Sequence, residues 1–241
     1  MDFTVVKGMQ SEIFVPVTPA PVWAPVTKPL KDMTIAIATA AGVHHKDDKR
    51  FNLAGDFSYR IIKDTMPSSE LMVSHGGYDN SDVNKDINCM FPIDRLHELA
   101  KDGVIGKVAP VHVGFMGGGG NQEKFKNETG PAIANILKDE GVDAVILTAG
   151  WGTCHRSAVL VQRAIESVGI PTIIIAALPP VVRQTGSPRA VAPLVPMGAN
   201  AGEPHNVEMQ YNIVKDTLEQ LEVIDQPGKI VPLPYEYVAK V

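Results

Sequence analysis

Residues 143–157, with the sequence DAVILTAGWGTCHRS, constrain the fold of this chain most strongly. They begin with a run of apolar and small residues, which is typical of a strand buried on both faces of a sheet. Gly150 and Gly152 then allow a tight turn, and Thr153 is suited to cap a helix over residues 156–168. The stretch therefore predicts a buried strand, a tight turn and a helix in direct succession.

Strand, turn and helix alternate in this way five times along the chain. Strands are expected over residues 33–42, 69–74, 108–116, 143–149 and 171–178, and helices over residues 90–100, 123–140, 156–168 and 206–222. We therefore predict an α/β fold with an open, mainly parallel sheet and helices on both faces, built as one body or as two lobes around a crevice. Residues 51–64 are expected to be partly helical, and the proline-rich residues 178–190 to be irregular.

The first thirty residues differ from the rest in composition. Prolines recur between Pro16 and Pro29, a spacing that excludes a helix and a central strand. The sequence thus predicts a Pro-rich extended arm, residues 1–30, followed by one α/β domain, residues 31–241. Trp23 in the arm is expected to be buried against a partner or a neighbouring copy, and the alternative is a strap packed on the chain's own body.

Composition excludes several classes of protein. The chain has 241 residues, a net charge of −5 and two cysteines, and its pI is about 5.8. An acidic balance does not favour nucleic-acid binding, and two cysteines are too few for a disulfide framework. The N-terminus lacks the features of a signal peptide and no apolar run reaches the length of a membrane span. We expect a cytoplasmic protein that binds no membrane.

Polar residues follow the ends of several expected strands, which meet at one edge of a parallel sheet. His44 and His45 follow the first strand. They are candidates to orient a substrate carboxylate or to relay protons, and the alternative is that they are solvated loop histidines. His75 follows the second strand, and a glycine run around Gly118 follows the third. The run lacks the G-K-[ST] ending of a phosphate loop, so its backbone N–H groups are better suited to a carboxylate. His75, His155, His205 and Cys154 do not have the compact spacing of zinc ligands, so no metal is expected.

Residues 151–154, named the redox turn here for the role that the family resemblance given below implies, place Trp151 and Cys154 three positions apart at the expected helix start. Two sulfur or selenium atoms at positions i and i+3 of a helix start can reach each other, and the exposed N–H groups stabilise the first as an anion. His155 and Arg156 are expected to add positive charge. In this chain the first position is Trp151, which has no nucleophilic side chain, and the second is Cys154.

Two segments carry a resemblance to a known family. The run GWGTCHRS and residues 75–106, HGGYDNSDVNKDINCMFPIDRLHELAKDGVIG, are similar to the selenoprotein B family of glycine, sarcosine, betaine and D-proline reductases, and most of all to its small, D-proline-type subunits. The resemblance implies selenocysteine at the position of Trp151 and a resolving cysteine at Cys154. A UGA codon read or replaced as Trp accounts for this difference, because UGA and UGG differ by one base. The candidate substrate-binding residues are Gly150, Gly152, Thr153, His155, His44, His45 and Gly118.

The resemblance also implies a reaction and a partner. The reaction is the reductive opening of D-proline to 5-aminovalerate in amino-acid fermentation. The pyruvoyl group that activates the substrate amine is expected on a partner subunit, so this chain itself binds no cofactor and acts in a hetero-oligomer. With Trp151 in place of the nucleophile, the chain as written is expected to be inactive.

Three alternatives remain open at this stage. Cys154 alone is more often a small buried apolar residue, and Trp151 alone is more often a packing or stacking residue. The same chemistry could act on sarcosine, betaine or glycine. The third alternative is a two-thiol, racemase-like enzyme or a ligand-binding module on a similar sheet. The racemase requires Cys89 and Cys154 to face each other across a small cavity, whereas Cys89 by itself indicates a buried structural thiol.

Overall fold

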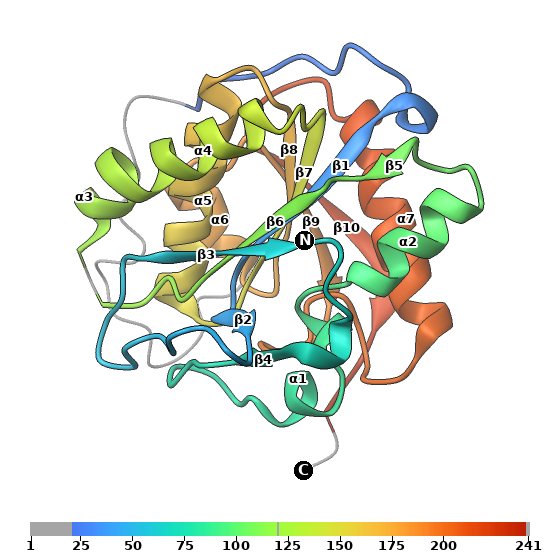
Figure 1. The fold of residues 1–241 in the computed structure, drawn as a ribbon. Helices are drawn as coiled ribbons and strands as arrows, with labels where there is room; N and C mark the ends of the chain where they lie inside the picture. Colours follow the sequence, from blue (N-terminus) through green and yellow to red (C-terminus); the bar gives the residue numbers. More distant parts are fainter. Residues whose placement is uncertain (1–20, 120, 240–241) are drawn as a thin grey trace.

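The computed structural model describes residues 21–119 and 121–239 of the chain (Figure 1). Its α-helices are α1 (Ser81–Lys85), α2 (Ile93–Lys101), α3 (Gln122–Lys124), α4 (Gly130–Asp139), α5 (Gly152–Ser167), α6 (Pro179–Thr185) and α7 (Val207–Val223), and a π-helical turn, η5 (Phe125–Thr129), joins α3 to α4. Short 3-10 turns are η2 (Leu30–Asp32), η3 (Ser68–Glu70) and η4 (Ile87–Cys89). The strands are β1 (Thr34–Ala40), β2 (Val43–His45), β3 (Tyr59–Lys63), β4 (Leu71–Val73), β5 (Lys107–Val108), β6 (Val111–Phe115), β7 (Ala144–Ala149), β8 (Thr172–Ile175), β9 (Arg189–Leu194) and β10 (Lys229–Glu236).

One eight-stranded sheet forms the centre of the fold. Its strands follow the order β10-β9-β8-β7-β1-β6-β3, with β5 paired to β1. All neighbours from β10 to β6 are parallel, and β3 is antiparallel to β6 at the edge. The predicted α/β class, with a mainly parallel sheet, is confirmed.

The order of the strands places a ligand-binding edge at the centre of the sheet. The chain passes from β1 to β6 on one side, and then returns to β7 on the other side of β1. In a doubly wound sheet the connections diverge at such a point, and a crevice opens beyond the carboxyl ends of the two strands. The crevice is therefore expected beyond the ends of β1 and β7.

Helices cover both faces of this sheet (Figure 1). On one face α2 and α7 pack on a core that includes Ile35 and Ile37 of β1, and on the other face α4 and α5 pack on a core that includes Ala36, Ala38 and Ala40. Successive side chains of a strand point to opposite faces, so β1 presents isoleucines to one layer and alanines to the other. The alanines leave room for α5 to approach the sheet closely.

The structure corrects the predicted second strand. Residues 71–73 form β4, but β4 pairs with β2 in a separate two-stranded antiparallel sheet. The four other expected strands became β1, β6, β7 and β8 of the main sheet. The sequence pattern cannot distinguish these cases, because a short apolar run is the same in either sheet.

Two further expectations were wrong. The segment 51–64 contains no helix, and its last part is the edge strand β3. The segment 178–190 is regular, since it forms α6 and the start of β9. Pro179 and Pro180 occupy the first turn of α6, where a missing N–H is tolerated, and Gly186 ends the helix with a φ of +81°.

The strap, residues 21–30, packs on the chain's own body, which is one of the two alternatives for this part of the arm. The Trp23 ring lies 3.4 Å from Cζ of Arg189. Arg189 is buried, donates to Glu166 at 2.7 Å and to the carbonyl of Ala24 at 2.7 Å. Glu166 accepts the N–H of Ala24 in return. A buried ion pair therefore anchors the strap to α5 and β9, while residues 1–20 lie outside the described residues and their docking stays a prediction.

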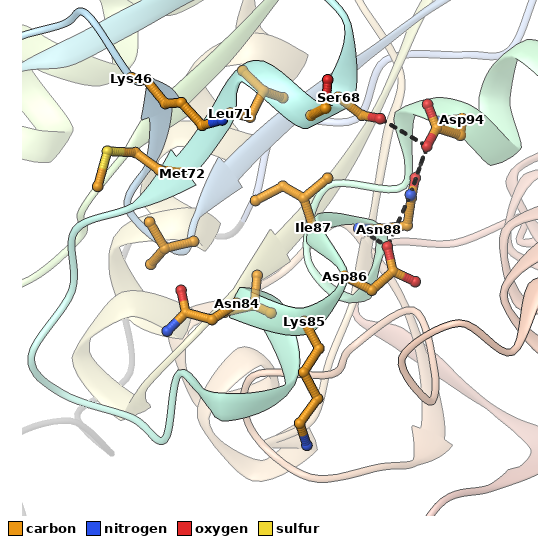
Figure 2. Close-up of a pocket in the computed structure, with 13 residues that line it drawn as sticks. Lys46, Ser68, Leu71, Met72, Asn84, Lys85, Asp86, Ile87, Asn88 and Asp94 are labelled. Carbon is orange, nitrogen blue, oxygen red and sulfur yellow. Dashed lines mark hydrogen bonds between the residues drawn. The ribbon is translucent and has the colours of Figure 1, made fainter.

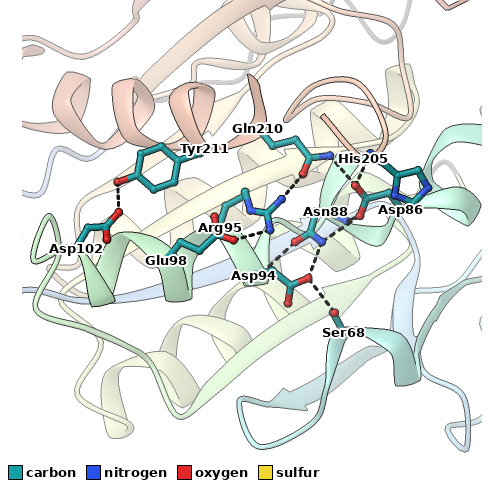
Figure 3. A network of polar contacts seen from close by, with 10 residues as sticks. All are labelled: Ser68, Asp86, Asn88, Asp94, Arg95, Glu98, Asp102, His205, Gln210 and Tyr211. Atoms are coloured by element: carbon teal, nitrogen blue, oxygen red, sulfur yellow. Dashed lines mark hydrogen bonds and ion pairs between the residues drawn. The ribbon is translucent and has the colours of Figure 1, made fainter. Parts of the chain in front are cut away.

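A polar network joins η4, α2 and α7 on the opposite side of the sheet from α5 (Figure 3). Asp86 accepts hydrogen bonds from the N–H of His205 and from Gln210, both at 2.8 Å. Gln210 in turn accepts from Arg95 at 3.0 Å. His205 adopts a left-handed conformation with a φ of 62°, and its bond to Asp86 holds the loop before α7 in place.

Among the described residues, no helix combines the length and apolar character that crossing a membrane requires.

The buried ion pair of the strap gives a first prediction. Replacement of Arg189 by Met leaves the Glu166 carboxylate buried without its cation, so the free energy of unfolding should fall by about 3–5 kcal/mol. Urea unfolding measures this change. Arg183→Met, at an exposed arginine of α6, is the matched control and should change stability by no more than about 0.5 kcal/mol. Equal effects of the two substitutions would show that the pair does not anchor the strap.

Candidate redox site at the carboxyl edge of the sheet

The redox turn lies where the sequence predicted it. Strand β7 ends at Ala149, and α5 begins at Gly152, directly beside the switch point between β1 and β7. The N-cap residue is Trp151, with φ −116° and ψ 177°, and its side chain makes no capping bond. Thr153 lies inside the first turn of α5, so the prediction that it caps the helix was wrong.

A close aromatic contact explains the glycine at position 150. The ring of Tyr78 occupies the space that a Cβ of Gly150 would fill, and it also lies against Gly198. The Tyr78 hydroxyl donates to the carbonyl of Ala41, just beyond β1, at 2.9 Å. Tyr78 therefore fills the switch point and fixes the backbone on either side of it, which requires Gly150 to lack a side chain.

The two positions of the redox turn differ sharply in exposure. Trp151 is 39% exposed, whereas Cys154 is fully buried. The side chain at position 151 lies beside Gly77, whose Cβ would be 3.3 Å from Cβ of Trp151. An outer residue at the helix start and an inner cysteine three residues later is the arrangement that a redox pair needs, because the outer atom meets the substrate and the inner one resolves the adduct.

Cys154 is buried in an apolar core, but two polar groups contact its sulfur. Its Sγ lies 2.9 Å from Nε2 of His75 and 3.3 Å from the carbonyl oxygen of Met116. Burial raises the pKa of the Cys154 thiol to about 12, and hydrogen bonds from the backbone and from the Thr153 side chain only partly oppose this. Cys154 is therefore a protonated thiol at neutral pH.

His75 contacts Cys154 and is a candidate site residue to which the sequence analysis gave no role, although it placed His75 at the correct edge. It is separated from Cys154 by 79 positions in the sequence. Burial lowers the pKa of His75 to about 4, so the ring is neutral. The signals in the sequence were its position in the HGGY turn directly after an expected strand and its place at the start of the family-like segment 75–106.

His155 does not carry the positive charge expected of it. The side chain is fully buried, and burial lowers the pKa of His155 to about 4. Its Nδ1 donates to the carbonyl of Trp151 at 2.8 Å, and its Nε2 has no hydrogen-bond partner. A neutral ring cannot stabilise an anion by charge, so any such contribution near the turn comes from the helix N-terminus and from Arg156.

His44 and His45 lie on β2 rather than in an open loop. His44 is fully buried, and its two ring nitrogens contact the carbonyl of His45 at 2.6 Å and the hydroxyl of Ser74 at 2.8 Å. Nδ1 of His45 accepts the N–H of Asp47 at 3.2 Å. The ring of His44 is thus already satisfied within the protein, and its predicted contact with substrate stays a prediction.

The described glycines after β6 pack closely rather than forming an open loop. Gly117 has a φ of +73°, and a Cβ there would lie 3.1 Å from Cα of Cys154. Gly118 donates its N–H to the sulfur of Met116 at 3.1 Å. Gly119 lies against the backbone of Gly55, since a Cβ on Gly119 would be 2.7 Å from the Cα of that residue. The close contact of Gly117 with Cys154 brings the segment after β6 against the start of α5. The carboxylate site expected at Gly118 stays a prediction.

Cys89 does not face Cys154. It lies fully buried in the core beneath α2 and α7, with its Sγ 3.9 Å from the carbonyl of Asp82. Cys154 belongs to the core on the other face of the sheet. The two thiols therefore line no common cavity, which contradicts the racemase alternative.

A cavity of about 450 Å³ lies away from the redox turn (Figure 2). It is lined by residues of η3, β4, α1 and η4, and also by Lys46 after β2, Asp86 between α1 and η4, and Asp94 of α2. Within the described part of the chain, no three His, Cys, Asp or Glu side chains are arranged to hold a metal ion.

An α/β protein of the doubly wound class, with an exposed and a buried position three residues apart at a central helix start, has the frame of a thiol- or selenol-based redox protein. The sequence profile of the glycine/sarcosine/betaine reductase selenoprotein B family matches residues 6–150. The chain belongs to this family. The profile match ends at Gly150, directly before the redox turn.

Individual relatives extend the comparison across the turn. The chain is 73% identical to D-proline reductase subunit gamma of Acetoanaerobium sticklandii over 240 residues, which covers 100% of this chain and 99% of that protein. It is 34% identical to glycine reductase complex component B subunit gamma of Carboxydothermus hydrogenoformans, covering 75% of this chain and 42% of that protein. It is 33% identical to sarcosine reductase complex component B subunit beta of Peptoclostridium acidaminophilum, and the match covers 83% of this chain and 48% of that protein. No solved structure matches the chain significantly.

Packing at the turn gives a second prediction. Gly150→Ala drives a methyl group into the Tyr78 ring, so we expect a loss of about 1–3 kcal/mol in the free energy of unfolding. Gly76→Ala is the control, because its new Cβ would be in ordinary contact with Leu53 at 3.7 Å. Urea unfolding of both variants measures the difference, and a Gly150→Ala variant as stable as the control would contradict the observed contact.

Buried neutral histidines give a third prediction. His75 and His155 have pKa values of about 4 in the folded protein and ordinary values of 6.5 when unfolded. Between these values the unfolded chain binds more protons, so the free energy of unfolding should fall as the pH drops from 6.5 towards 4. His155→Asn should make this pH dependence shallower, whereas Leu53→Ala, at an exposed non-ionisable residue, should leave it unchanged. An identical slope in all three proteins would contradict the assignment.

Proposed function

We propose that this chain is the subunit of a D-proline reductase that contributes the redox turn for the reductive opening of D-proline to 5-aminovalerate. The observation that carries the proposal is the 73% identity to D-proline reductase subunit gamma over the full length of both chains. The geometry of the turn supports it, because position 151 is exposed and Cys154 is buried directly behind it. The chain is thus one component of an oxidoreductase complex.

The degree of similarity to the relatives favours D-proline over the other family substrates. The glycine and sarcosine reductase relatives are 33–34% identical, and the chain spans only 42–48% of their length. A protein matched over 99% of its length is the better guide to substrate than proteins matched over less than half.

The proposed chemistry uses the two positions of the turn in sequence. In the family pattern, selenocysteine stands where this chain has Trp151. Its selenolate attacks the α-carbon of D-proline, and the carbon–nitrogen bond breaks with its electron pair on nitrogen. The thiol of Cys154 then attacks selenium, the selenium–carbon bond breaks, and the carbon takes the electron pair and a proton. A selenium–sulfur bridge remains, and a dithiol donor reduces it.

A partner subunit completes the site. The pyruvoyl group expected on that subunit would activate the substrate amine by withdrawing electrons from the bond to be broken. The relatives of the present chain are subunits of reductase complexes, which supports a hetero-oligomer. The small amino-acid substrate would bind where the two subunits meet at the redox turn. The cytoplasmic location remains a prediction from the sequence.

The fourth prediction concerns position 151. The chain with Trp151 should bind its pyruvoyl partner and form no 5-aminovalerate, because an indole offers no ionisable nucleophile. Trp151→Sec should restore turnover, and Trp151→Cys should give a lower rate, because its thiolate is scarcer at neutral pH. The measurement is 5-aminovalerate formed from D-proline with a dithiol donor and the partner subunit.

Cys154→Ser in the selenocysteine form separates the two steps. It should stop the reaction after attack and leave an adduct that mass spectrometry detects on the turn. Full activity of the Trp151 chain, with Trp verified by mass spectrometry, would exclude position 151 as the nucleophile.

A further inference from the structure

His75 and Cys154 come from distant parts of the chain and meet beneath the redox turn, with Nε2 and Sγ 2.9 Å apart. We propose that His75 is the hydrogen-bond donor that stabilises the thiolate of Cys154 each time the bridge between positions 151 and 154 opens. This inference rests on the proposed function, because it gives a role in that redox cycle to a residue outside the turn. It also concerns the isolated chain, so it can be tested without substrate.

The surroundings of the His75 ring fix where its proton lies. Nδ1 accepts the N–H of Gly77 at 2.9 Å, so this nitrogen carries no proton. Nε2 faces the sulfur of Cys154 at 2.9 Å, and that sulfur lies 3.3 Å from the carbonyl oxygen of Met116. Because Nδ1 accepts, the neutral ring carries its proton on Nε2 and points it at Sγ of Cys154.

The loop that presents His75 is held from several sides. Asn80 donates to the carbonyl of His75 at 2.6 Å. The Tyr78 ring packs against the His75 ring with the centroids 4.7 Å apart. A Cβ on Gly77 would come within 2.9 Å of Cε1 of His75, so the glycine allows the loop to fold tightly beside position 151. The donor is thus rigid, which is what a hydrogen bond to a transient anion requires.

Burial explains why Cys154 needs such a donor. A charge in an apolar environment without a partner is strongly unfavourable, and the Cys154 side chain is fully buried. As a thiol, Cys154 can donate to Met116 and accept from His75. As a thiolate it loses the first bond and keeps the second, which becomes a charge-assisted bond and is therefore stronger.

The step in which His75 acts is the reduction of the bridge. One thiolate of a dithiol donor attacks the outer atom at position 151, and the bond to Cys154 breaks. Its electron pair remains on Sγ as a thiolate, which receives the Nε2–H bond of His75 and then takes a proton from solvent. The second thiol of the donor forms the donor disulfide and releases the outer atom. The donor loses two electrons, the bridge gains them, and His75 keeps its own proton throughout.

The test uses the Trp151→Cys chain, whose oxidised form closes a disulfide to Cys154. We measure its rate of reduction by dithiothreitol as a function of pH. His75→Leu in this background should slow reduction by about 10- to 100-fold, the effect of one hydrogen bond to a charged group. His75→Gln, which retains an N–H donor at a similar reach, should recover most of the rate. His205→Asn is the control and should leave the rate unchanged.

A second measurement uses the chain with Trp151 as it stands. Nitrogen chemical shifts of the His75 ring should show a proton on Nε2 and none on Nδ1 at neutral pH. A proton on Nδ1 overturns the proposal, and so does a folded His75→Leu variant that is reduced as fast as its parent. If His75→Leu does not fold, the chemical shifts alone decide. Neither measurement involves D-proline, so failure of the proposed substrate would leave this result standing.

Discussion

The close approach of the first turn of α5 to the carboxyl edge of the sheet is the constraint on which the site depends. Gly117 leaves space for the backbone of Cys154, and Gly150 leaves space for the Tyr78 ring. Ala40 on β1 presents only a methyl group to the same layer. Because these residues are small, a helix start, two strand ends and the loop carrying His75 meet within hydrogen-bonding distance. A larger side chain at any of these positions would separate the groups that the chemistry requires.

The same tight packing sets the protonation states at the site. Burial disfavours charge, so Cys154 is a thiol with a pKa near 12 and His75 and His155 are neutral with pKa values near 4. The interior therefore offers hydrogen bonds rather than full charges. An anionic nucleophile suits only the exposed outer position, where the N–H groups of the helix start are available. In this chain that position holds Trp151, so under the proposed function the inner cysteine is present and the outer nucleophile is not.

Two contact sets hold the frame at a distance from the site. The strap fixes the far end of α5 to β9 through Trp23, Arg189 and Glu166. The network around Asp86 joins α2 to the loop before α7. Both combine segments that are distant in sequence, so they restrict how the helical layers can move relative to the sheet. The redox turn is thereby placed on rigid elements, with its exposed side free for a partner.

The sequence by itself determined the strand, turn and helix around the redox turn, because the period of apolar residues and the glycines act locally. It also determined the parallel sheet, since regular alternation of strands and helices allows few other topologies. Only the tertiary structure decided that β4 leaves the main sheet, that residues 179–185 are helical and that His155 is neutral. The meeting of His75 with Cys154 was also decided there, because it depends on how a loop 79 residues away packs against α5. Hydrogen-bond partners and burial depend on how distant segments pack together, and the local sequence pattern does not specify them.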